Sequence, residues 1–225
     1  MRSLWRTSDR GTLRDIALVC LADALVGASF GAIAVAGGLP AWVPISMSVL
    51  VFAGGAQFAA LAVVLSGGGA LAAVATGLVL NSRLLLFGFA VSDVLDGRRR
   101  TRLLGAHLVM DEALAFTMRH QDRARRRAAF WTCGIALFAC WNISVVLGAM
   151  AGEAIGDTDA LGLDAAFPAV LLALVVPALR DPRTRTAALT GAAIAVAATP
   201  FLPPGLPVLL ALTGLVVPHL LRKTA

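Results

Sequence analysis

The sequence predicts an all-α polytopic membrane protein, on the basis of its apolar composition, the length of its hydrophobic stretches and the placement of its basic residues. Of the 225 residues, 59% are hydrophobic and 14% are charged, and the mean hydropathy is +0.84. An average soluble domain is about half apolar and about a quarter charged, so a water-soluble fold of this size could not hide so much apolar surface. We expect about six to seven hydrophobic helices in one membrane domain that covers residues 1–225.

The hydrophobic stretches are separated by short polar joints rich in Gly, Pro and Asp, which favour chain reversal. Most of them are long enough to cross a hydrocarbon layer of ~30 Å as helices, although the last ones are short. The predicted spans are residues 16–38, 44–65, 70–94, 128–150, 163–179, 187–200 and 206–221.

The 19 Lys and Arg residues lie outside these spans, with the single exception of Arg83. Basic residues confined to short loops follow the positive-inside rule, so residues 1–15, the basic region 96–127 and the C-terminus are predicted to face the cytoplasm. The joint after residue 150 carries four acidic residues and no basic one, which indicates the outer side. This distribution favours a membrane protein over a nucleic-acid-binding one, despite the net charge of +6.

The first half of the chain conflicts with this topology. An inside N-terminus followed by three crossings would place the Arg run at 98–102 on the outside. One segment must therefore be broken or re-entrant, and the best candidate is 16–38, where Asp23, Gly27, Ser29 and Gly31 interrupt the apolar run. Transporters use such broken helices to present free backbone groups to substrate. An outside N-terminus and a crossing by residues 103–118 are the alternatives.

Arg83 is predicted to lie about halfway through the bilayer, with Asn81 beside it. An ionised group at that depth costs ~2.5 kcal/mol or more, so it needs a partner or a task. The planar guanidinium suits a carboxylate, either that of a protein Asp or that of an amino acid. A structural ion pair inside the bundle with one of three acidic residues and a substrate site remain equally open; those three residues are Asp23, Asp93 and Asp111.

Further polar residues complete the set of candidates. Gln57 follows Gly54-Gly55 in the second span and is predicted to be either packing glue between helices or a substrate ligand. Asp111 and Glu112 are preferred as proton-coupling carboxylates, together with Asp23. His107 and Asp111 are one helical turn apart and suit a proton relay or half of a metal site, but no further ligands stand at helical spacing, so no metal site is predicted.

Motifs for ATP hydrolysis, zinc chemistry and haem attachment do not occur in the sequence, and we expect no cofactor. An intramembrane enzyme would need a nucleophile and a base that face each other, and nothing links His107 to a particular Ser. We therefore expect a protein that is not an enzyme.

Four motifs resemble the AzlC family of branched-chain amino acid permeases in order and spacing. They are Gly27-Ala28-Ser29-Phe30-Gly31, Phe52-Ala53-Gly54-Gly55-Ala56-Gln57-Phe58, Leu80-Asn81-Ser82-Arg83 and Met110-Asp111-Glu112. The resemblance implies a bacterial inner-membrane exporter of valine, leucine, isoleucine or methionine that works with a small hydrophobic subunit of the AzlD type. By position, Gln57, Asn81, Arg83, Asp111 and Glu112 match the polar motifs of the family. Where the family often has Leu-Asn-Leu-Arg, this chain has Ser82 in place of the second Leu.

The resulting hypothesis is a proton-coupled secondary exporter. The carboxylate of the amino acid would bind Arg83 or free backbone groups near Gly27 and Ser29, and Gln57 and Asn81 would complete the polar shell. The alternative is a scaffold or sensor subunit that transports nothing, in which these polar residues only lock the bundle. Which amino acid is moved, the coupling ion and the oligomeric state do not follow from the sequence.

Overall fold

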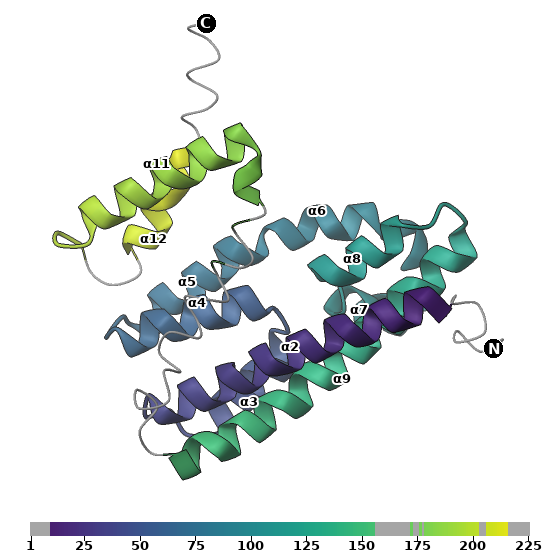
Figure 1. The fold of residues 1–225 in the computed structure, drawn as a ribbon, viewed down its shortest axis with the longest axis horizontal. Helices are drawn as coiled ribbons and strands as arrows, with labels where there is room; N and C mark the ends of the chain where they lie inside the picture. Colours follow the sequence, from purple (N-terminus) through teal and green to yellow (C-terminus); the bar gives the residue numbers. More distant parts are fainter. Residues whose placement is uncertain (1–9, 156–171, 173–175, 177, 203–205, 216–225) are drawn as a thin grey trace, which may run out of the picture. The chain divides into compact units, whose positions relative to one another are not determined.

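The computed structural model describes residues 10–155, 172, 176, 178–202 and 206–215. The chain divides into two compact units, the first formed by Met1–Gly54 with Asn81–Leu161 and the second by Gly55–Leu80 with Gly162–Ala225. All regular elements within the described residues are helical, which confirms the predicted all-α class (Figure 1). Three stretches of the described residues are long and apolar enough to cross a membrane: Arg10–Ala36, Ala70–Ala90 and Arg123–Ala154.

The helices of the first unit are α2 (Arg10–Ala36), α3 (Trp42–Leu50), α6 (Arg83–Ala90), the 3-10 turn η1 (Ser92–Val94), α7 (Arg99–His107), α8 (Asp111–Met118) and α9 (Arg123–Ile155). Those of the second unit are α4 (Gly54–Leu65) and α5 (Ala70–Asn81), which share one end residue each with the first unit, followed by η3 (Ala178–Arg180), α11 (Pro182–Ala198), α12 (Leu206–Ala211) and η4 (Leu212–Leu215).

Helices α2 and α9 pack along most of their length and run in the same direction (Figure 1). Cys140 lies against Cys20 near the middle of the two helices, and Gly152 lies against Ala32 near the last turn of each helix. Glycines make this close approach possible, because a Cβ atom at Gly148 would lie 2.0 Å from the carbonyl oxygen of Ala28. The basic first turns of both helices consequently lie at the same end of the unit, which we call the basic end.

The predicted break within residues 16–38 is wrong. Helix α2 is continuous for 27 residues, and Gly27 and Gly31 face α9 instead of interrupting the helix. A Cβ atom would lie 2.3 Å from Ser144 Oγ at Gly27 and 2.2 Å from the Val145 carbonyl oxygen at Gly31. The four-residue spacing of small residues thus creates a packing face, as is common between membrane helices.

The break falls instead inside the predicted span 44–65. Helix α3 ends at Leu50, and Phe52 adopts a positive φ of 40°, which is unusual for a bulky residue and marks a sharp turn. The Phe52 ring packs edge-on against Phe138, with centroids 5.0 Å apart. Phe138 is about 22 Å along α9 from Arg123, close to the middle of that helix. Helix α3 therefore leads from the far end of α2 to about half depth and stops.

Helices α7 and α8 form a second excursion to half depth, entered from the basic end. A Cβ atom at Gly105 would lie 3.3 Å from the Trp131 ring, and the His107 ring lies 5.7 Å from that of Phe138. The chain then turns at residues 108–110 and returns, so that Met118 receives a contact from Arg126. This pair of helices is a re-entrant hairpin and does not cross, which excludes the alternative of a crossing by residues 103–118.

These two half-depth elements resolve the topological conflict. In the fully described stretch between α2 and α9, Ala70–Ala90 is the one segment that is long and apolar enough to cross a membrane. Neither α3, with 9 residues, nor α4, with 12, approaches the ~20 residues that a crossing needs. The basic residues at the start of α7 lie near the basic end, since the preceding Asp96 is bound by Arg127 there.

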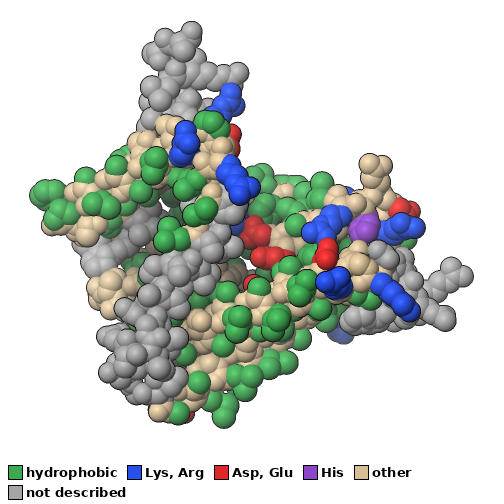
Figure 2. All heavy atoms as spheres, viewed as in Figure 1, with side chains coloured by type: hydrophobic (Ala, Val, Ile, Leu, Met, Phe, Trp, Pro, Cys, Tyr) green, Lys and Arg blue, Asp and Glu red, His purple; other side chains and the backbone are tan. Residues whose placement is uncertain are grey.

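The outer surface of the first unit is apolar along its length and charged at the basic end (Figure 2). Leu21 and Leu25 on α2 and Ile143 on α9 are more than half exposed, as expected for side chains that face lipid. In the second unit, α11 is capped by Asp181, whose carboxylate accepts a hydrogen bond of 2.7 Å from Thr184 N. Helix α11 packs against α12 and η4. Most of the predicted span 163–179 and the end of 206–221 lie outside the described residues.

Candidate functional site

Arg83 forms a two-pronged ion pair with Asp111. Its Nη1 donates to Asp111 Oδ1 at 2.9 Å, and its Nη2 lies 2.8 Å from Oδ2. Arg83 is the first residue of α6, which follows α5 with only Ser82 between them, and Ser82 itself keeps helical backbone angles. Asp111 is the first residue of α8 and follows the extended Met110 at the turn of the hairpin. Of the three acidic residues considered from the sequence, the structure thus selects Asp111 as the partner.

The pair lies away from both ends of the first unit. Leu108, three residues before Asp111, would lie 3.1 Å from a Cβ atom on Gly134. Gly134 is about 16 Å along α9 from Arg123, at a rise of 1.5 Å per residue. The Arg83 and Asp111 side chains are nevertheless 49% and 43% exposed. An ion pair at this depth that remains open differs from a fully buried lock, because a small molecule can reach both charges.

Asp23 and Glu112 form a second acidic pair close by. The two carboxyl groups interact electrostatically, although Asp23 belongs to α2 and Glu112 to the first turn of α8. Oδ2 of Asp23 is buried and has no hydrogen-bond partner among the described residues. An ionised carboxylate with a buried, unpaired oxygen is unfavourable, so this group is suited to hold a proton.

Gly27 and Ser29 were predicted to bind substrate because a broken helix would expose their backbone groups. Helix α2 is continuous there, so that reason no longer applies. Gly27 packs against α9, and the Ser29 hydroxyl donates to the Leu25 carbonyl oxygen of its own helix at 2.9 Å. Gln57 is fully buried on α4 and belongs to the second unit. It stays a predicted ligand.

His107 does not share a helical face with Asp111, because α7 ends at His107 and the chain turns before α8 begins. Its Nε2 instead lies 2.8 Å from the Val49 carbonyl oxygen at the end of α3. A carbonyl oxygen only accepts, so Nε2 is the donor in this bond. The imidazole thereby joins the ends of the two half-depth elements beside Phe52 and Phe138. The sequence did not predict this contact. The available signal was the pair Gly54-Gly55 inside the predicted span 44–65, which could have indicated a chain break.

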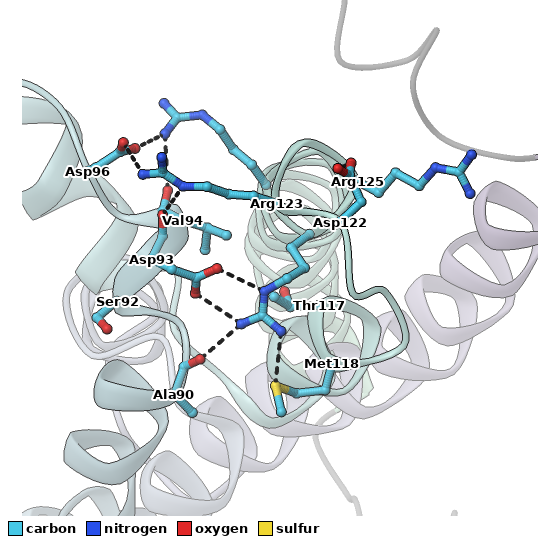
Figure 3. Close-up of polar contacts among 12 residues, drawn as sticks. Ala90, Ser92, Asp93, Val94, Asp96, Thr117, Met118, Asp122, Arg123 and Arg125 are labelled. Atoms are coloured by element: carbon cyan, nitrogen blue, oxygen red, sulfur yellow. Dashed lines mark hydrogen bonds and ion pairs between the residues drawn. The ribbon is translucent and has the colours of Figure 1, made fainter.

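A cluster of ion pairs closes the basic end and ties η1 to α9 (Figure 3). Arg126 donates to Asp93 through Nε and Nη2, both at 2.9 Å, and to the Ala90 carbonyl oxygen at 3.1 Å. Arg123 and Arg127 both bind the carboxylate of Asp96. We call these five charged side chains the η1–α9 clamp; it fixes the end of α6 and therefore supports the position of Arg83.

The clamp should make the protein sensitive to acid. The Arg126 guanidinium holds the pKa of Asp93 below its usual value. A carboxyl whose pKa is depressed in the folded state adds stability above its unfolded pKa of about 4, and this contribution is lost as the pH falls through the folded pKa. We expect Asp93→Asn to lower the thermal midpoint in detergent at pH 7, with the difference from the wild type shrinking below about pH 4. A difference that stays constant down to pH 3 would contradict this assignment.

A groove of about 1100 Å³ runs between α6 and α7. Apolar side chains, among them Leu84 and Leu103, form most of its wall. Asn81 and Val109 lie at the inner end, each two residues from a member of the Arg83–Asp111 pair. The residues at the basic end of the groove are Asp96, Gly97, Arg99 and Arg102.

Comparison with known protein families gives a match. A family model described as AzlC protein matches residues 18–155, which is more than half of the sequence and contains every element from α3 to α8. The chain belongs to the AzlC family. This membrane protein family is associated with branched-chain amino acid transport, and it is a transporter-type family. Comparison with curated proteins and with solved structures gave no match.

Within this AzlC chain, the family match contains all of the sequence-predicted site residues. The structure brings four of them into two neighbouring pairs, Arg83 with Asp111 and Asp23 with Glu112. Asn81 lines the groove beside the first pair. The arrangement offers one cation and one anion side by side, next to an apolar wall.

Proposed function

We propose that this protein is a secondary transporter that exports branched-chain or similar apolar amino acids, such as valine, leucine, isoleucine and methionine, across the bacterial inner membrane. The observation that carries the proposal is the open Arg83–Asp111 pair at the tip of the α7–α8 hairpin. A small hydrophobic subunit of the AzlD type is the expected partner. The N- and C-termini are expected to face the cytoplasm, because both carry basic residues and so follow the positive-inside rule.

The Arg83–Asp111 pair matches the charges of an amino acid zwitterion. The substrate carboxylate replaces that of Asp111 on the guanidinium, and the substrate ammonium binds Asp111. Each charge of the resting pair thus receives a new partner, so no charge is left unpaired within the membrane when the substrate binds or leaves. The neighbouring apolar wall accepts the aliphatic side chain, with Asn81 available for a further hydrogen bond.

Selectivity on such a wall is limited. One methylene in a hydrophobic pocket changes binding by ~1–3 kcal/mol, so several apolar amino acids should share the site. Charged and strongly polar side chains would have to leave water for an apolar surface, which disfavours them.

We assign proton coupling to Asp23 and Glu112, since Asp111 is engaged by Arg83. In liposomes, Glu112→Gln should reduce leucine transport driven by a pH gradient at least tenfold. Leucine exchange without a gradient should continue, because it needs no net proton movement. Glu153→Gln, which alters an exposed carboxylate near the end of α9, is the matched control. Gradient-driven transport that survives Glu112→Gln would overturn the coupling role of this residue.

The function itself is tested in cells. Cells that express this chain, with and without its co-encoded small hydrophobic protein, are loaded with dipeptides of valine, leucine or methionine, and efflux of the free amino acid is measured. We expect faster efflux and chemically unchanged substrate outside. If neither condition gives any gain, the protein is instead a scaffold whose charged pairs lock the bundle.

A further inference from the structure

We propose that the groove between α6 and α7 is the vestibule through which the amino acid substrate reaches the Arg83–Asp111 pair from the basic end of the protein. This inference rests on the proposed transport function and adds a route to it. The groove connects the two places that such a route must join, because its residues run from Arg99 and Arg102 to Asn81 and Val109.

The size of the groove fits passage better than tight binding. Pockets that enclose a drug-sized ligand measure about 300–1,000 Å³, and an apolar amino acid is smaller than such ligands. At about 1100 Å³ the groove leaves room for the substrate and water together. A vestibule of this size beside a charged pair would gather substrate before binding.

The charges of the groove also suit a zwitterion. Arg99 and Arg102 at the basic end attract the carboxylate, and the charge of Asp96 does not repel it because Arg123 and Arg127 of the η1–α9 clamp neutralise that charge. Between the two ends the wall is apolar, with Leu85 and Phe89 on α6. Charge complementarity at both ends and an apolar middle favour an apolar amino acid over a lipid tail, which would not need the inner polar end.

Gly88 is a suitable position at which to block the groove by substitution. It lines the groove on α6, and a Cβ atom there would meet no other atom within 4 Å. A side chain at this position can therefore begin in open space, with no clash at its Cβ atom. Gly77, on α5, is equally open but does not line the groove, which makes it a matched control in the same candidate span.

The experiment compares leucine transport by Gly88→Trp and Gly77→Trp at equal amounts of protein in the membrane. We expect Gly88→Trp to reduce transport at least tenfold and Gly77→Trp to change it less than twofold. Equal transport by the two variants would overturn the vestibule while leaving the proposed function intact. If the wild type moves no leucine, the proposed function fails first, and the vestibule falls with it.

A labelling measurement tests the same route without relying on obstruction. Gly88→Cys is placed in a background that lacks Cys20, Cys133 and Cys140, all of which are free thiols. A membrane-impermeant maleimide should modify it from the cytoplasmic side in inverted vesicles, and leucine should slow the reaction at least threefold, whereas aspartate should not. Modification from the opposite side only, or a rate that leucine leaves unchanged, would contradict the proposal.

Discussion

Replacing Arg83 by Ala is expected to reduce leucine efflux about thirtyfold or more while the protein remains in the membrane. The substitution leaves the Asp111 carboxylate without its two-pronged partner and removes the cation that would receive the substrate carboxylate. Truncating one member of a buried charge pair costs ~2–5 kcal/mol. Because both side chains are about half exposed, we take the lower end, which corresponds to a loss of binding of about thirtyfold. Efflux from cells and the abundance of the protein in membranes are measured together.

A charge exchange separates substrate binding from bundle locking. The double variant with Arg83→Asp and Asp111→Arg restores an ion pair between α6 and α8 but reverses its polarity relative to the apolar groove. If the pair only locks the bundle, the double variant recovers both abundance and any activity. If the pair binds substrate, it recovers abundance alone, since the zwitterion can bind the charges only with its side chain turned away from the groove.

The second large effect is expected at the contact between α2 and α9. Gly148→Leu would place a Cβ atom 2.0 Å from the Ala28 carbonyl oxygen, and a backbone atom cannot move aside as a flexible side chain can. Overpacking typically costs ~1–3 kcal/mol, and we expect the upper end or more because the whole helix pair would have to separate. The yield of monodisperse protein in size-exclusion chromatography should fall at least fivefold.

Gly77→Leu serves as the control for this contact, because a Cβ atom on Gly77 meets nothing within 4 Å. It should be produced at the wild-type level. Normal yield and thermal stability of Gly148→Leu would show that the two helices do not approach as closely as described here.

The fold class and the approximate positions of the spans follow from composition and hydropathy, because those properties report transfer from water to lipid directly. The location of the helix break does not follow from these properties. Gly27 and Gly31 fit a broken helix and a close helix contact equally well, and only the opposing Gly148 and Gly152, with the same spacing, distinguish the two. The actual turn at Phe52 contains neither Gly nor Pro at its sharpest point.

The sequence indicates which residues form the candidate site, but it does not indicate which of them pair with each other. Arg83 stands out in any hydropathy profile, yet three acidic residues were available to it, and the choice of Asp111 depends on the turn at residues 108–110 that brings α8 back toward α6. Likewise, the contact between His107 and Val49 joins two chain breaks that no local pattern connects. Long-range pairing of this kind is decided by packing.

The central claim, that the Arg83–Asp111 pair receives the substrate, is tested most directly by equilibrium binding of radiolabelled leucine to the purified protein. We predict saturable binding by the wild type, binding weakened about thirtyfold or more by Arg83→Ala, and binding unchanged by Glu153→Gln. Wild-type affinity in Arg83→Ala would contradict the account.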